Sequence, residues 1–203
     1  MKIIEQSWEW LQQPVKPLEI IERAGRTCYK SEKRITSGSA EKFVQMILEM
    51  GHETVLEHAS ASVRFITNRG VTHELVRHRL ASFSQESTRY VKYGDEIECI
   101  KPVWWDDVNY SKARKQIWID AMESAEKAYH AALKAGDKPE QAREMLPHAT
   151  KVEIVVTANF REWRHIFELR GSVKAHPQMR ALIQDCLHGF AVEIPVVFAD
   201  LLG

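Results

Sequence analysis

Residues 150–170, which read TKVEIVVTANFREWRHIFELR, decide the expected fold of this chain. The first part, TKVEIVVTA, is rich in β-branched residues, which favour a strand. Asn159 follows, and asparagine is a preferred N-cap for a helix, here FREWRHIFELR. A strand and a helix joined with almost no loop predict a mixed architecture of α and β elements.

Helices are expected wherever apolar residues recur at helical spacing. One covers residues 39–50 with Ser39 as its cap, and the longest covers about residues 111–135. A shorter helix is expected between residues 137 and 147, and the last begins near Pro177. This last helix has an apolar stripe suited to a core or a subunit interface. The stripe consists of Met179, Leu182, Ile183, Cys186, Leu187 and Phe190.

Strand patterns are shorter. Residues 59–67, ASASVRFIT, alternate in the way of a half-buried strand, and residues 2–11 and 96–101 are further candidates. Between these, THELVRHRL over residues 72–80 predicts a short helix opened by Thr72, with a polar loop after it. The chain contains no repeat, linker or change of composition that would mark a second domain, so residues 1–203 are expected to form one domain.

Composition is that of an ordinary globular protein. The 203 residues include 28 basic and 28 acidic side chains, a formal net charge of zero, and 44% hydrophobic residues. This balance excludes a disordered chain and a basic nucleic-acid coat. A chain of this length buries roughly 70% of the surface that its unfolded form exposes, so it needs no disulfides to hold a core.

The cysteines and the apolar runs bear on the expected location. Cys28, Cys99 and Cys186 are odd in number, far apart and without a Cys-x-x-Cys pair, which argues against a disulfide framework or a structural zinc site. No apolar run approaches the roughly 20 residues of a membrane span, and the N-terminus has no signal-peptide core. These features predict a soluble protein of the cytoplasm.

The segment from Arg77 to Tyr90, RHRLASFSQESTRY, holds the densest chemistry of the chain. It has three arginines, one histidine, three serines, one threonine and one tyrosine. On a helix Arg77 and Arg79 would diverge by about 200° and face two different ligands. Ser87 and Arg89 beside a turn suit a phosphate monoester, because the planar arginine fork pairs with phosphate through two hydrogen bonds. The alternative is a solvated, charged turn.

The order of these residues resembles the signature of the flavin-dependent thymidylate synthases. In register with it are Arg77, His78, Arg79, Ser87, Arg89 and Tyr90. Further blocks follow the family's order over roughly residues 40–190. They are GHETVLEH (51–58), AREMLP (142–147), TANFRE (157–162), LR (169–170) and AHPQMR (175–180).

The resemblance implies a fold and a reaction. The fold is a mixed α/β domain with a central sheet flanked by helices, assembled as a homotetramer with active sites built from several subunits. The reaction is reductive methylation of dUMP to dTMP, with methylenetetrahydrofolate as carbon donor. FAD, reduced by NADPH, supplies the hydride.

The resemblance also assigns residues to the flavin. Its contacts fall on His52, Thr54, Arg77, His78, Arg79, Gln85, Asn159, Phe160, Arg161 and His165. A helix opened by Asn159 has free N–H groups that favour an anion such as the pyrophosphate, and Arg161 and His165 lie four residues apart on one face of it. Capping alone is the alternative role for Asn159. Neither His52 and His58 nor the cysteines have the spacing of a metal motif, so no metal is expected.

A second set is assigned to dUMP. It consists of Glu74, Leu75, Val76, Arg77, Gln85, Glu86, Ser87, Thr88, Arg89, Arg143 and Arg170. Ser87, Arg89 and Arg143 are expected to hold the phosphate, and Arg170 is the expected catalytic residue, drawing negative charge onto the pyrimidine so that the methylated carbon becomes nucleophilic. An arginine near the C-terminus of a helix is its alternative role. Glu74 departs from the glutamine of many relatives, and a carboxylate repels phosphate unless it pairs with an arginine.

Two rival functions remain at this stage. One is a single-stranded nucleic-acid-binding module in which Arg77, Arg79 and Arg89 contact the backbone and Tyr90 and Trp104 stack on bases. The zero net charge speaks against it, and the resemblance implies no nucleic-acid partner and no membrane. The other is an inactive homologue that keeps the fold, against which the intact arginines argue.

Overall fold

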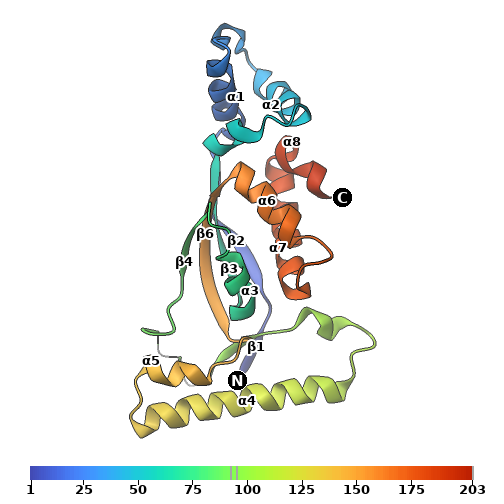
Figure 1. The fold of residues 1–203 in the computed structure, drawn as a ribbon. Helices are drawn as coiled ribbons and strands as arrows, with labels where there is room; N and C mark the ends of the chain where they lie inside the picture. The colour runs from blue at the N-terminus through green and yellow to red at the C-terminus, as the bar shows by residue number, and fades with distance from the viewer. Residues whose placement is uncertain (92, 95, 203) are drawn as a thin grey trace. The chain divides into compact units, whose positions relative to one another are not determined.

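The computed structural model describes residues 1–91, 93–94 and 96–202. β6 (Lys151–Asn159) runs directly into α6 (Phe160–Arg170), as Figure 1 shows. Every second residue of β6 is buried, from Val152 to Ala158, and the residues between them are partly exposed. The Asn159 side chain accepts a hydrogen bond from the Glu162 backbone N–H at 2.9 Å, which caps α6. The predicted strand, cap and helix are confirmed.

The main sheet has four strands in the order β2-β3-β6-β4. Its other members are β2 (Ser7–Gln12), β3 (Ser60–Asn68) and β4 (Ser82–Gln85). β1 (Lys2–Ile4) and β5 (Glu98–Ile100) form a separate parallel pair, with Lys2 opposite Glu98 and Ile4 opposite Ile100. The fold class is therefore mixed α/β, as predicted.

Two predictions about strands are wrong. Residues 2–11 form two strands in different sheets, not one, because the backbone of Lys2 and Ile4 pairs with β5. The segment predicted as a polar loop contains β4, whose exposed and half-exposed residues gave no apolar signal. Both errors arise because pairing with a distant segment, which short-range patterns do not report, decides strand formation.

The chain divides into two compact units, and β2, β3 and β6 each run from one into the other. The first unit comprises Met1–Trp8, Arg64–Arg77 and Phe83–Val155. The second comprises Glu9–Val63, His78–Ser82 and Val156–Gly203. That residues 1–203 act as one domain stays a prediction.

In the first unit the longest described helix, α4 (Lys112–Ala135), packs against α5 (Pro139–Ala142) and the 3-10 helix η4 (Arg143–Met145). Ser111 caps α4, and Gly136 ends it with a φ of 108°, a conformation that only glycine adopts readily. The unit also contains α3 (Arg69–Leu75) and the 3-10 helix η3 (Val103–Asp106). Its core cluster is formed by Tyr93, Ile97, Cys99, Tyr129 and Ala142.

The second unit is mostly helical. It contains α1 (Pro17–Cys28), α2 (Ser39–Glu49), α6, α7 (Pro177–Glu193), α8 (Pro195–Phe198) and the 3-10 helices η1 (Glu32–Arg34), η2 (Glu53–His58) and η5 (Ala199–Leu202). On α6 the ring of Trp163 stacks on that of Phe167 at 5.6 Å. Packing of α7 against α6 brings Phe190 within 5.0 Å of both rings. The apolar stripe of α7 is fully buried, so it serves the core.

Two helix starts differ from the prediction. α2 is capped by Gly38, because the Ser39 hydroxyl donates to the Glu22 carboxylate instead. α3 begins at Arg69, since the Asn68 side chain accepts from the Val71 N–H at 2.9 Å, while the Thr72 hydroxyl donates to the Arg69 carbonyl. α3 ends at Leu75, five residues before the predicted end, so the predicted helix over residues 72–80 is wrong. Within the part of the chain described, no helix combines the length and the apolar character needed to cross a membrane.

Candidate active site

The second unit brings His78, Glu162 and Arg170 into one chain of hydrogen bonds. His78 follows α3 and is 5% exposed, whereas Glu162 lies in the first turn of α6 and Arg170 at its end. The His78 Nδ1 atom lies 3.0 Å from the Glu162 Oε1 atom. On the other side of the ring, the Arg170 Nε–H donates to His78 Nε2 at 3.1 Å. Both ring nitrogens are thus engaged within the protein.

Burial lowers the pKa of His78 below its usual value, and the hydrogen bond to Glu162 only partly opposes this effect. The positive charge of Arg170 lowers it further. A neutral imidazole agrees with the geometry, because Nε2 accepts a hydrogen bond only when it carries no proton. His78 therefore accepts a hydrogen bond from the Arg170 guanidinium at Nε2, and its Nδ1 atom is hydrogen-bonded to the Glu162 carboxylate.

His165 completes a small cluster on α6. Its ring meets that of His78 edge to face at 5.5 Å, and one ligand atom each of His78, Glu162 and His165 lie within 4.8 Å of one another. Two histidines and one carboxylate are a possible donor set for a transition metal. The guanidinium of Arg170 at His78 places a positive charge at this cluster, which opposes a second cation.

The residues assigned to the flavin lie mostly in the second unit, in η2, around His78 and at the start of α6. Arg161 is exposed and pairs with Glu57 at 2.7 Å, and His52 and Thr54 are exposed at the start of the η2 segment. Phe160 differs from its assignment, since its side chain is in the core against Phe198 and its backbone N–H donates to the Ala59 carbonyl. The predicted flavin contact of the Phe160 side chain is therefore not supported.

The donor chemistry of this region fits an anionic cofactor. Two N–H groups of the first turn of α6 already have partners, since Phe160 donates to the Ala59 carbonyl and Glu162 to the Asn159 side chain. The positive end of the helix dipole and the exposed Arg161 still favour an anion there. Arg79 and His165 are also exposed and offer further donors. Arg77, which is assigned to both the flavin and dUMP, is likewise exposed. Because α3 ends at Leu75, Arg77 and Arg79 do not lie on a helix, and the prediction that they diverge from one is wrong.

The residues assigned to the nucleotide phosphate lie in the first unit. The Ser87 hydroxyl accepts from the Arg89 backbone N–H at 3.3 Å, in a turn closed by hydrogen bonds from Tyr90 and Val91 to the Ser87 carbonyl. Arg89 is exposed and meets Glu140 at 3.6 Å, and Arg143 meets Glu144 at 3.8 Å. Such partly exposed pairs are weak, so both arginines can exchange their partners for a phosphate.

Other residues of the same assignment have structural partners. Gln85 donates to the Thr72 hydroxyl at 3.2 Å, and the Glu86 carboxylate accepts from Lys151 and from the Glu153 backbone. Thr88 and Leu75 are buried, whereas Glu74 is half-buried and Val76 is exposed. Leu75 fills the core, and its side chain contributes no polar contact.

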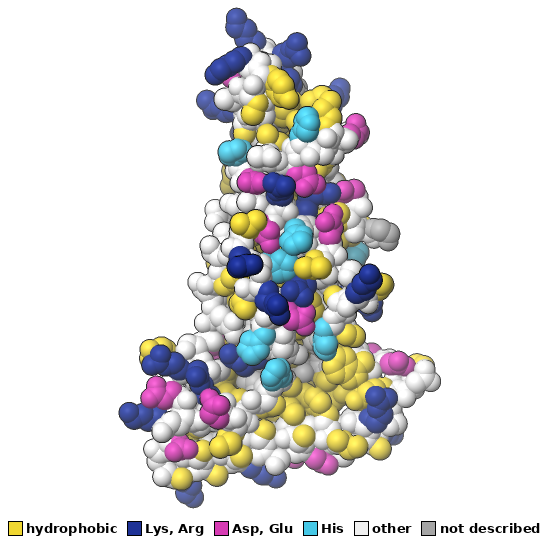
Figure 2. Space-filling model, in the orientation of Figure 1, with side chains coloured by type: hydrophobic (Ala, Val, Ile, Leu, Met, Phe, Trp, Pro, Cys, Tyr) yellow, Lys and Arg dark blue, Asp and Glu magenta, His cyan; other side chains and the backbone are white. Residues whose placement is uncertain are grey.

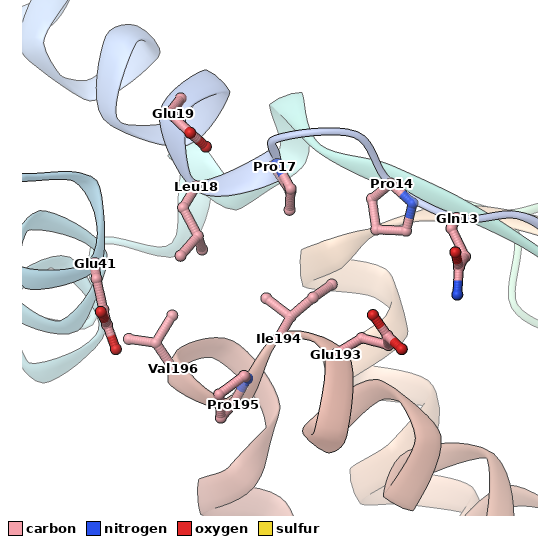
Figure 3. A pocket seen from close by; sticks show the side chains of 10 residues that line it. All are labelled: Gln13, Pro14, Pro17, Leu18, Glu19, Glu41, Glu193, Ile194, Pro195 and Val196. Carbon is pink, nitrogen blue, oxygen red and sulfur yellow. The ribbon is translucent and has the colours of Figure 1, made fainter. Parts of the chain in front are cut away.

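Two pockets of the second unit differ in their relation to these residues. One, of about 330 Å³, is lined by His52 together with Arg26, Tyr29, Arg34 and Met50 among others. The other, of about 310 Å³, has Glu41 and Glu193 beside the apolar Leu18 and Val196, as Figure 3 shows. None of the predicted site residues lines this second pocket.

A comparison with protein families identifies the family of this chain. The family model for "thymidylate synthase complementing protein" matches residues 11–196. The chain belongs to this family. A flavin-dependent thymidylate synthase of Mycobacterium tuberculosis (strain H37Rv) is 38% identical over 200 residues, which cover 89% of this chain and 78% of that protein. The enzyme of the same name from Corynebacterium glutamicum is 38% identical over 202 residues, with the same coverage.

A solved structure has the same fold as this chain. It is a UMP/dUMP methylase, PolB from Streptomyces cacaoi, bound with 5-Br dUMP. The two folds superpose with a TM-score of 0.82 over 98% of this chain and 96% of the other, at 23% sequence identity. The flavin-dependent thymidylate synthase fold predicted from the sequence is confirmed.

One residue of this thymidylate synthase family member was missed by the sequence analysis. Glu162 lies inside the TANFRE block, but it had no assigned role, because a carboxylate in the first turn of a helix is common. Its position three residues before His165, on one face of the predicted helix, was the available signal.

Proposed function

We propose that this protein catalyses the reductive methylation of dUMP to dTMP, with methylenetetrahydrofolate as carbon donor and NADPH as reductant. Membership of the flavin-dependent thymidylate synthase family over residues 11–196 carries the proposal. FAD is the proposed cofactor, and in its reduced form it supplies the hydride for the transferred carbon. We place the reaction in the cytoplasm.

The flavin would be held by the first turn of α6 and by exposed donors near it. The positive end of the α6 dipole suits the pyrophosphate, and Arg161 offers a cation there if it releases Glu57. Arg79, His165, Thr54 and His52 are the further proposed contacts. The phosphate of dUMP would be bound by residues of the first unit whose present partners are weak or exposed. These are Ser87, Arg89 and Arg143.

Arg170 is the proposed catalytic residue. Its guanidinium is always charged and is oriented by the hydrogen bond to His78, so it offers a fixed positive charge to the pyrimidine. Negative charge develops on that ring as its carbon becomes nucleophilic, and a preorganised cation stabilises this charge without reorganising. We further propose that the protein works as a homotetramer with sites built from several subunits.

The visible absorption spectrum of the purified protein tests the proposal first. Flavin bands that bleach on anaerobic addition of NADPH, at a rate altered by dUMP, are expected, and conversion of dUMP to dTMP with methylenetetrahydrofolate should then be detected by mass spectrometry. A colourless protein that does not bind added FAD would overturn the proposal.

The rival function, binding of single-stranded nucleic acid, has no support in these observations. The formal net charge is zero. Figure 2 shows acidic side chains among the basic ones over most of the face, although basic side chains gather at its upper end. Salt-dependent binding of a single-stranded oligonucleotide by a colourless protein would favour that rival.

A further inference from the structure

Glu162 is buried but has no role in the function proposed above. Its side chain is 7% exposed, although a carboxylate is rarely buried unless it has a partner. The partner is His78, whose side chain is 3% exposed and whose Nδ1 atom lies 3.0 Å from the Glu162 carboxylate. Helix capping does not account for this contact, since the cap of α6 uses the backbone N–H of Glu162 and the side chain of Asn159.

The direction of each hydrogen bond follows from the chemistry of the three groups. The Nε of a guanidinium always carries a proton and only donates, so His78 Nε2 must offer a lone pair to Arg170. In a neutral imidazole the proton then lies on Nδ1, and Nδ1–H donates a hydrogen bond to the Glu162 carboxylate. The carboxylate of Glu162 thus selects the one tautomer of His78 that can accept from Arg170.

We propose that Glu162 is a positioning residue, which fixes the tautomer and orientation of His78 so that His78 holds the guanidinium of Arg170 in its catalytic orientation. This inference rests on the proposed function of Arg170. An acid that orients a histidine through Nδ1–H is a recurrent device in enzymes, and its loss lowers turnover although the acid contacts no substrate. The proposed order of action is Glu162, then His78, then Arg170.

A metal ion is a weaker explanation of the same cluster. It would need His78 Nδ1 or Nε2 as a ligand, and these atoms are engaged with Glu162 and Arg170. It would also add positive charge beside the Arg170 guanidinium. The tautomer assignment uses every described contact of the His78 ring nitrogens and needs no further group.

Protonation of His78 should release Arg170, because an imidazolium has no free lone pair at Nε2. The charged and titratable groups that face His78 are Glu162, His165 and Arg170, all on α6. Glu162 favours the imidazolium through its negative charge, and the other two oppose it. Replacing Glu162 by glutamine removes the charge but leaves an amide oxygen that can accept from Nδ1–H.

The test compares Glu162→Ala and Glu162→Gln with the wild-type enzyme. For Glu162→Ala we expect kcat for dTMP formation to fall about 10- to 100-fold, as for other losses of catalytic orientation, with a much smaller change in the KM for dUMP and with flavin still bound. Glu162→Gln should restore most of kcat. Its acid limb in the profile of kcat against pH should move to lower pH, because the pKa of His78 falls when the charge is lost.

Glu168→Gln is the matched control, an exposed glutamate on the same helix, and should leave kcat and the acid limb unchanged. A Glu162→Ala enzyme with wild-type kcat, or a Glu162→Gln enzyme whose acid limb does not move, would overturn the inference. If Glu162→Ala does not fold, the acid limb of Glu162→Gln decides the question.

A measurement without turnover separates this inference from the proposed function. Histidine labelled with ¹⁵N should show a His78 resonance protonated at Nδ1 and not at Nε2 in the wild-type protein, assigned by its loss in His78→Gln. A proton on Nε2 would overturn the inference even in an active enzyme. The expected tautomer in a protein that makes no dTMP would uphold the positioning geometry and overturn the proposed function alone.

Discussion

The Nε–H of Arg170 donates to Nε2 of His78 at 3.1 Å, although 92 residues separate them along the chain. This bond joins the segment after α3 to the end of α6, and it engages the guanidinium through its Nε edge. An arginine at the C-terminus of a helix would be favourable without it. The bond to a buried imidazole adds a fixed orientation, which the proposed catalytic role of Arg170 requires.

Replacing Arg170 tests the catalytic assignment. Arg170→Ala should keep the flavin spectrum but lower the rate of dTMP formation by about 100- to 1000-fold, the effect of losing one preorganised electrostatic group. Arg170→Lys should give an intermediate rate, because lysine keeps the charge but loses the planar fork and the bond from Nε. Steady-state turnover at saturating dUMP measures both. Wild-type activity in Arg170→Ala would remove the assignment.

Two substitutions of Asn159 distinguish a capping role from a ligand-binding role. Asn159→Ala should lower the free energy of unfolding by about 1 kcal/mol, because the cap to the Glu162 N–H is lost. Asn159→Asp should restore that stability, since aspartate is an equally good cap, but it should weaken FAD binding by placing a negative charge beside the pyrophosphate. Denaturant unfolding and flavin fluorescence titration measure the two effects. Equal FAD affinity in the Asp variant and the wild type would show that Asn159 is a cap only.

Ser87 is proposed to bind the phosphate of dUMP and not to act as a nucleophile. Ser87→Ala should raise the dissociation constant of dUMP about tenfold, the effect of losing one hydrogen bond to a charged group, and leave kcat nearly unchanged. Isothermal titration and steady-state kinetics measure the two quantities. Ser82→Ala, at an exposed position of β4, is the control. Complete loss of turnover with unchanged dUMP affinity would contradict the binding role.

Glu153 on β6 should make stability depend on acid pH. Lys151, at 2.6 Å, lowers the pKa of this carboxyl below its usual value, and Arg64, at 2.7 Å, adds to the effect. A carboxyl whose pKa is lower in the folded state stabilises the fold fully above its unfolded pKa of 4.5, and this contribution is lost as pH falls from there through the lowered value. Unfolding by urea between pH 6 and about pH 3 should therefore show a smaller loss of stability in Glu153→Gln than in the wild type. An identical pH dependence would contradict the role of these pairs.

Local patterns were sufficient for the elements whose signals lie within a few residues. The β6–α6 unit, α4 and α7 were predicted because their capping residues and apolar periodicity are contained in the segments themselves. β4 was missed, because its partner β6 lies far along the chain and its own four residues have no buried side chain. The start of α3 was misplaced because Asn68 and Thr72 both qualify as caps, and only the hydrogen bonds distinguish them.

The candidate site shows the same division. The order of the motif residues was enough to predict the family and to single out His78, Asn159 and Arg170, because the sequence determines which residue types are available in which order. The tertiary structure decided that Glu162 and His78 are partners and that Phe160 belongs to the core. Burial and hydrogen-bond direction depend on which distant segments meet. The contact of His78 with Glu162 and its hydrogen bond from Arg170 exist only in the tertiary structure.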